Sequence, residues 1–190
     1  IPGEKTIEWY KRLFNGTITD HHWNADFSNL SALINKQGWQ KIKHDVSNHI
    51  KAIYILREPC ERLWSQFKFS QKPNTQITEA QLIQQASTFL ATRSAKIHSQ
   101  YCFNLDNARA GLGIENVKAL IFDDIQDKPL EFLKSIEQFL KISDHNYINT
   151  GDLGRKINTT SNNIPPSQFR LLCEAITRRE IEGLNHRGIK

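Results

Sequence analysis

The stretch "IYILREPCERLWSQFKFS", from Ile53 to Ser70, decides the fold of this 190-residue chain. Four apolar residues lead into Arg57, and the continuous run that begins at Lys51 predicts a strand buried on both faces. Pro59 then marks the first turn of a helix, where its missing N–H costs nothing. A buried strand followed by a helix is typical of a parallel α/β sheet, whose ligands bind at the carboxyl ends of the strands.

The remaining segments continue this alternation of strands and helices without a low-complexity linker or a repeat. We therefore predict one α/β domain over residues 1–190, with helices on both sides of a parallel sheet, in three layers. We expect a short helix over 6–14, helical structure over 78–105 that breaks near 94–99, and a second buried strand over 116–122. A further helix should follow Pro129, with its apolar face at Leu130, Leu133, Ile136, Phe139 and Leu140. A loop over 144–163 and a last helix over 165–184 complete the expected elements.

Composition favours a soluble, globular protein, with 38% hydrophobic and 24% charged residues and no apolar run long enough to span a membrane. The net charge of +5 suits an anionic ligand, but no run of like charges resembles a nucleic-acid-binding tail. Cys60, Cys102 and Cys173 are isolated, without zinc-ligand spacing, and read as free thiols of a reducing, cytoplasmic compartment. Three Asn-x-Ser/Thr sequons, at Asn15, Asn29 and Asn158, keep the Golgi lumen open as the alternative.

Arg57 and Ser65 are the first candidate site residues. Arg57 stands at the carboxyl end of the first strand, and Ser65 lies about two helical turns in from Pro59, so that both side chains can converge on one anion. A guanidinium fork and a hydroxyl suit a phosphate. By spacing alone, a surface ion pair of Arg57 with Glu58 or Glu61 is the favoured explanation of the arginine.

The segment "REPCERLWSQF" resembles the Arg-x-Pro-x-x-Arg-x-x-Ser-x-Tyr/Phe motif of sulfotransferases that use 3′-phosphoadenosine 5′-phosphosulfate (PAPS). The resemblance implies a P-loop NTPase-like fold, and it implies that Arg57 and Ser65 hold the 3′-phosphate of PAPS or of its product PAP. Downstream, "VKALIFDDIQDKPLEFLKSIEQFLKIS" is similar to the family's second landmark, in which a strand leads to an acidic pair, here Asp123 and Asp124, and then to a proline and a helix.

Upstream, "WNADFSNLSAL" resembles a stretch of carbohydrate-type and bacterial sulfotransferases that carries the general base, and the resemblance assigns this role to Asp26. Ala25 and Asn29 replace the glycine and proline of that stretch. A surface aspartate that caps a helix remains the alternative for Asp26. In the same family the loop that corresponds to residues 144–163 folds over the cofactor, which places Arg155 and Lys156 near the 3′-phosphate.

The family's Gly-Thr-rich loop for the 5′-phosphosulfate, with its lysine, has no counterpart in the sequence. The chain also contains no methionine, so we expect the natural start and this loop to lie upstream of residue 1. After Asn29, the residues Ser31, Ala32 and Leu33 come one position earlier than their counterparts in the family's stretch. A methionine missing after Asn29 would restore the spacing.

The sequence thus predicts a metal-independent sulfotransferase that moves a sulfuryl group from PAPS to a hydroxyl or amine by in-line attack. The acceptor, a small molecule or a carbohydrate, is not identified by the sequence, and His21, His22 and the Gln/Asn-rich residues 66–85 are candidates for its pocket or for solvated surface.

Two alternative functions stay open. One is a P-loop-type nucleotide kinase, in which Asp123 or Asp124 would bind Mg²⁺. The other is a non-catalytic module that binds anionic polymers through basic residues.

Overall fold

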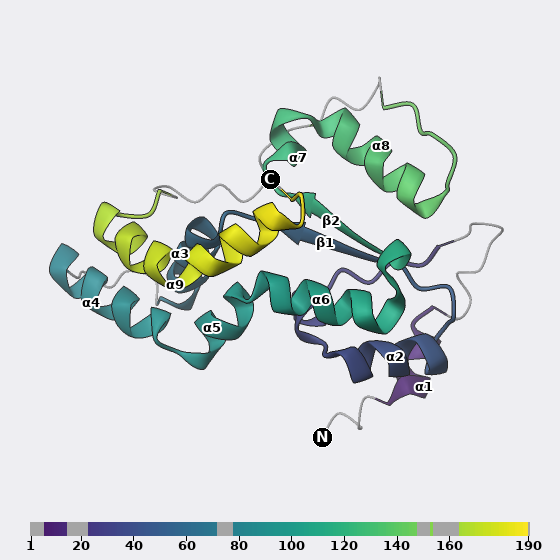
Figure 1. Ribbon diagram of the computed structural model, residues 1–190, viewed down its shortest axis with the longest axis horizontal. Coiled ribbons are helices and arrows are strands. Elements are labelled where there is room, and N and C mark those ends of the chain that lie inside the picture. The colour runs from purple at the N-terminus through teal and green to yellow at the C-terminus, as the bar shows by residue number, and fades with distance from the viewer. Residues whose placement is uncertain (1–5, 15–22, 72–77, 148–152, 154–163, 190) are drawn as a thin grey trace.

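Two parallel strands, β1 (Ala52–Leu56) and β2 (Val117–Ile121), form the sheet of the computed structural model, which describes residues 6–14, 23–71, 78–147, 153 and 164–189. The strands pair in register from Ala52 opposite Val117 to Leu56 opposite Ile121. Both predicted strands are therefore confirmed to within two residues. The fold is mixed α/β with parallel strands, and most of its described elements are helices (Figure 1).

Helices lie on both faces of this sheet. On one face, Ala52, Tyr54 and Ala119 pack against the helix α6 (Tyr101–Leu112). On the other face, the ammonium groups of Lys51 and Lys118 lie 4.3 and 5.8 Å from the centre of the Phe139 ring, which belongs to α8 (Pro129–Leu140). Figure 1 shows α6 and α8 on opposite sides of the two arrows.

The helix α3 (Pro59–Ser70) begins where the sequence predicts, with Pro59 in its first turn. Its buried residues, which include Leu63, Trp64 and Phe67, recur at helical spacing and form one apolar face. This face joins α4 (Glu79–Leu90), α5 (Arg93–Ser99) and the long C-terminal helix α9 (Ser167–His186) in one hydrophobic cluster. The strand–helix unit that carries the candidate site thus rests on the largest packed cluster of the described residues.

The helical region after residue 78 differs from the prediction. Residues 93–99, where a break was expected, form α5, and the breaks lie instead at Ala91–Thr92 and at Gln100. Thr92 explains the first break, because its hydroxyl caps α5 by accepting a hydrogen bond from the Ala95 N–H. The last of these helices, α6, runs to Leu112 rather than to Leu105.

The helix α2 (Lys36–Asp45) was not predicted. Asn35 caps its first turn, and Trp39 and Ile42 pack against Leu105 and Leu112 of α6. The two helices approach closely at Gly111, where a Cβ atom would lie 2.9 Å from the carbonyl oxygen of Lys36. A glycine is therefore needed at this crossing for steric reasons.

The predicted apolar face of α8 is present in part. Leu133, Ile136, Phe139 and Leu140 are partly buried, Leu130 is exposed, and the most buried residues of the helix are Phe132 and Glu137. The remaining described elements are short: α1 (Ile7–Arg12), η1 (Asn29–Leu33), η2 (Ile114–Asn116) and α7 (Asp124–Asp127).

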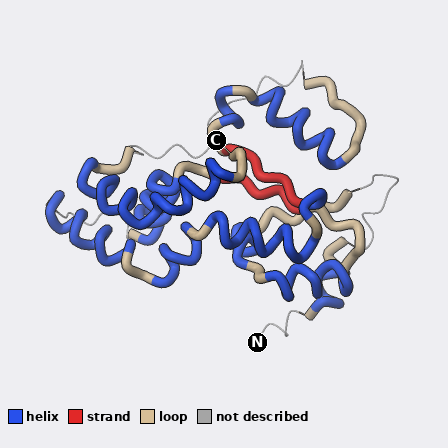
Figure 2. The backbone as a smooth tube through the Cα atoms, in the orientation of Figure 1, coloured by secondary structure: helices blue, strands red, loops and turns tan. Residues whose placement is uncertain are grey.

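The expected three-layer, P-loop-like architecture is not confirmed, since the described residues form a sheet of two parallel strands (Figure 2). None of the helices formed by the described residues is long and apolar enough to cross a membrane.

Candidate functional site

Arg57 lies at the carboxyl end of the sheet, directly after β1. The ladder between the strands ends beside it, where the Phe122 N–H donates to the Leu56 carbonyl over 2.7 Å. The Arg57 guanidinium lies over the Phe122 ring, 5.1 Å from its centre, and its Nη2 donates to Glu61 Oε2 over 3.3 Å. The Nε of Arg57 is buried and has no hydrogen-bond partner. The guanidinium is thus held across the ends of both strands, with unused donor capacity.

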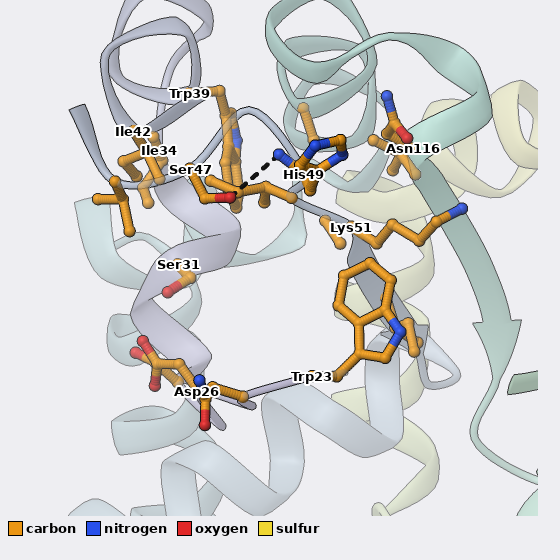
Figure 3. Close-up of a pocket in the computed structure, with 18 of the residues that line it drawn as sticks. Trp23, Asp26, Ser31, Ile34, Trp39, Ile42, Ser47, His49, Lys51 and Asn116 are labelled. Atoms are coloured by element: carbon orange, nitrogen blue, oxygen red, sulfur yellow. Dashed lines mark hydrogen bonds between the residues drawn. The ribbon is translucent and has the colours of Figure 1, made fainter. Parts of the chain in front are cut away.

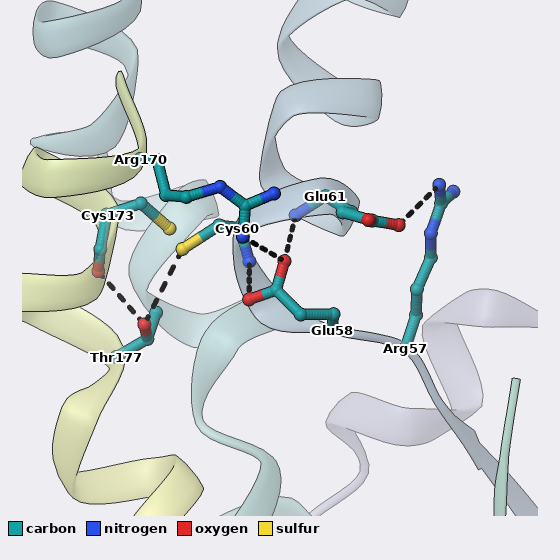
Figure 4. Close-up of polar contacts among 7 residues, drawn as sticks. All are labelled: Arg57, Glu58, Cys60, Glu61, Arg170, Cys173 and Thr177. Carbon is teal, nitrogen blue, oxygen red and sulfur yellow. Dashed lines mark hydrogen bonds and ion pairs between the residues drawn. The ribbon is translucent and has the colours of Figure 1, made fainter. Parts of the chain in front are cut away.

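Glu58 occupies the amino end of α3. Its two carboxylate oxygens accept hydrogen bonds from the backbone N–H groups of Cys60 and Glu61, over 3.0 and 2.8 Å (Figure 4). Arg170 of α9 approaches the same carboxylate to 3.9 Å. The first-turn N–H groups of Cys60 and Glu61 are therefore already satisfied, and an anion has to approach α3 from its side.

The side of α3 that is open to an anion carries residues spaced four apart. Arg57 precedes the helix, Glu61 lies one turn in, and Ser65 lies one further turn along the same side. Ser65 is exposed, and its hydroxyl has no hydrogen-bond partner among the described residues. Lys68 follows three residues later, and burial together with the positive charge of Arg57 lowers the pKa of its ammonium group.

Asp123, two residues after the end of β2, is a second carboxylate whose pKa responds to the charge of Arg57. Partial burial raises the pKa of Asp123, and the negative charge of Glu61 raises it further, although Arg57 acts in the opposite direction. Asp124 and Asp127 of α7 add to this effect. The surroundings of Arg57 therefore contain carboxylates as well as cations, so that its positive charge is partly balanced in the free protein.

Asp26 lies elsewhere, in a cavity of about 1420 Å³ beside the amino-terminal parts of the strands (Figure 3). The carboxylate is exposed and accepts a hydrogen bond from the Tyr10 hydroxyl over 2.9 Å. Burial and this hydrogen bond raise the pKa of Tyr10 to about 12. Trp23, from the same segment, donates its indole N–H to the Leu140 carbonyl over 3.1 Å and so ties the segment to the end of α8. Asp26 does not cap a helix.

The structure places Arg57 directly before α3 and Ser65 on the exposed side of that helix, and their predicted convergence on one anion stays a prediction. It does not bring Asp26 to them, because neither Arg57 nor Ser65 lines the cavity that contains Asp26. The predicted ion-pair alternative for Arg57 is present too, with Glu61 rather than Glu58 as the partner.

Four predicted residues fall in gaps of the described chain: Arg155, Lys156, His21 and His22 lie outside the described residues. Of the Gln/Asn-rich residues 66–85, the part over 72–77 also lies outside them. Their expected roles stay predictions.

Sequence reasoning missed two features of these sites. Lys68 continues the spacing of Arg57, Glu61 and Ser65, so a helical projection of α3 finds it. The contact of Tyr10 with Asp26 joins residues sixteen apart across an irregular segment, and no local pattern signals it.

All three cysteines are free thiols, and two of them, Cys60 and Cys173, are buried side by side between α3 and α9 (Figure 4). A hydrogen bond with Cys173 and burial raise the pKa of the Cys60 thiol, so it stays protonated at neutral pH. In the described part of the chain, no three His, Cys, Asp or Glu side chains are grouped so that they could hold a metal ion.

Comparisons of the chain with family models, with curated protein sequences and with solved structures found no match.

Proposed function

We propose that this chain is a sulfotransferase that uses PAPS as the donor and binds the 3′-phosphate of the cofactor through Arg57 and Ser65. The observation that carries the proposal is the position of the Arg57 guanidinium across the carboxyl ends of two parallel strands, where α/β proteins bind their ligands. Ser65 lies two turns along the adjoining helix, in the arrangement that the motif "REPCERLWS" requires.

The residues present suit a phosphate. The Arg57 side chain is partly exposed, and Ser65 is exposed. Charge-assisted hydrogen bonds from a guanidinium to a phosphate are among the strongest in proteins, and their planar geometry fixes the orientation of the anion. PAPS would supply the activated sulfuryl group, and the chain's own residues would anchor the cofactor at its far end.

We propose further that the two-stranded sheet is part of a larger parallel sheet in a three-layer, P-loop NTPase-like fold. The helices α6 and α8 on opposite faces support this arrangement. A strand as apolar as β1 is typical of a sheet buried on both faces.

Asp26 remains the proposed general base, which would take the proton of an attacking hydroxyl or amine. The 3′-phosphate and the sulfuryl group are at different ends of PAPS, so the base and the phosphate anchor need not be neighbours. Tyr10 holds the Asp26 carboxylate from one side and leaves the other oxygen for a second hydrogen bond.

The test is the binding of PAP to the 190-residue chain, measured by calorimetry for the wild type and for Arg57→Ala and Ser65→Ala. Arg57→Ala should weaken PAP binding by about 1.5–3 kcal/mol, because a hydrogen bond to a charged group is lost, and Ser65→Ala by about 1 kcal/mol. Arg178→Ala, which removes an exposed arginine of α9, is the matched control and should leave the affinity unchanged. If Arg57→Ala binds PAP as tightly as the wild type does, the proposed site is wrong.

A further inference from the structure

We propose that Glu61 is a built-in competitor of the phosphate, whose carboxylate pairs with the Arg57 guanidinium and is displaced when the anion binds. This inference rests on the proposed function, because it concerns the same anion site. It identifies a residue that sets the affinity and selectivity of the site rather than one that forms it.

The Glu61 carboxylate already occupies the Arg57 guanidinium, because Arg57 Nη2 donates to Glu61 Oε2 over 3.3 Å. Glu61 lies in the first turn of α3, and Ser65 follows it by one helical turn. A phosphate that binds Arg57 through Nη2 therefore has to replace the Glu61 carboxylate at that donor.

Arg57 does not depend on Glu61 for its position. The guanidinium lies over the Phe122 ring, 5.1 Å from its centre. This contact remains when Glu61 leaves, so the loss of the ion pair should free the Nη2 donor without releasing the arginine. This separates a competitor from a residue that merely orients Arg57.

The ion pair is also weak enough to be displaced. The side chains of Arg57 and Glu61 are 26% and 37% exposed, and pairs at such partly exposed positions contribute little to stability. A doubly charged phosphate monoester has the charge needed to replace the glutamate, whereas a singly charged anion competes less well.

The experiment compares PAP and 5′-AMP binding to the wild type and to Glu61→Gln by calorimetry at fixed pH and salt. The glutamine keeps the shape of the side chain and removes its charge. PAP should bind about three- to tenfold more tightly to Glu61→Gln, because the competing charge is gone, and AMP affinity should stay the same.

The matched control is Asp45→Asn, which removes one carboxylate from another partly exposed (i, i+4) ion pair, with Lys41, on α2. It should leave PAP binding unchanged, and an equal gain in both variants would attribute the effect to net charge alone and contradict the inference. Unchanged or weaker PAP binding by Glu61→Gln contradicts it as well. If Arg57→Ala still weakens PAP binding as predicted in that case, the proposed function survives and only the role of Glu61 is wrong. Absence of PAP binding by both wild type and Glu61→Gln would contradict both proposals.

Discussion

Among the described residues, the carboxylates of Asp26 and Glu137 both accept a hydrogen bond from a tyrosine hydroxyl, but they differ in their exposure to solvent. Asp26 is exposed at the edge of a large cavity, with Tyr10 on one of its oxygens. Glu137 is only 3% exposed, and one of its oxygens accepts from the Tyr147 hydroxyl over 2.6 Å and from the His145 N–H over 2.9 Å. The first carboxylate is accessible to a substrate, and the second fixes the chain that follows α8.

Asp26→Asn should lower the rate of PAP release from PAPS, in the presence of an accepted alcohol or sugar, by about 100-fold or more. The amide keeps the shape of the side chain but cannot take the proton of the attacking group. PAP affinity should be unchanged, because Asp26 lies apart from Arg57. Asp144→Asn, at an exposed position after α8, is the control. Wild-type turnover by Asp26→Asn would remove Asp26 from the mechanism.

Tyr147→Phe should raise the pKa of Glu137 toward its ordinary value. The Tyr147 hydrogen bond is the largest cause that holds this pKa down, ahead of the His145 N–H. A carboxyl whose pKa is lowered on folding stabilises the fold above its ordinary pKa, and this contribution is lost as the pH falls through the folded value. The variant should therefore be less stable than the wild type at neutral pH, and the difference should shrink in acid.

Carboxyl-selective NMR titration of Glu137 and urea unfolding at neutral and acidic pH check this prediction. Tyr147 itself stays protonated at neutral pH, because its hydrogen bond with Glu137 raises its pKa to about 12. An identical Glu137 titration in both proteins would show that the hydrogen bond does not form in solution.

At the scale of elements, α3 links the core to the candidate site. One side of the helix packs on α4, α5 and α9, where Trp64 and Phe169 bring their ring centres to 5.0 Å. The opposite, solvent-facing side carries Ser65 and Lys68. Packing on one side therefore sets the orientation of the residues on the other, so the geometry of the anion site depends on the hydrophobic cluster beneath it.

Phe67 and Phe69, two residues apart on α3, give a sharp test of this packing. Phe67 is 1% exposed and Phe69 is 94% exposed. Phe67→Ala should lower the free energy of unfolding by about 3–5 kcal/mol, because it removes buried apolar surface and leaves a cavity. Phe69→Ala should change it by less than about 0.5 kcal/mol. Urea unfolding measures both values, and similar effects of the two substitutions would contradict the orientation of α3.

At the scale of the whole molecule, local patterns predicted the elements that carry their own signals. The two apolar runs predicted β1 and β2, and Pro59 predicted the first turn of α3. The helix α2 carried an equally clear signal, with Trp39, Ile42 and Val46 at helical spacing after Asn35, and the same is true of Leu105, Ala108 and Leu112 in the extension of α6.

Other features depend on tertiary contacts that no local pattern contains. Trp23 meets Leu140 across 117 positions of the chain, and Gly111 is required only because α2 crosses α6 there. The positions of Arg57 at a strand end and of Ser65 on the following helix could be predicted, since one strand and one helix determine them. The separation of Asp26 from them could not, because it depends on how the segment before α2 packs against the end of α8.

The most direct test of the central claim is whether Arg57 recognises the one phosphate that distinguishes PAP from 5′-AMP. Calorimetry of both nucleotides with the wild type and Arg57→Ala gives four affinities, which form a cycle of residue against ligand. We predict that PAP binds more tightly than AMP to the wild type, and that Arg57→Ala weakens PAP binding by about 1.5–3 kcal/mol while AMP affinity stays the same. An equal loss for PAP and AMP would mean that Arg57 does not contact the 3′-phosphate, and would contradict the account.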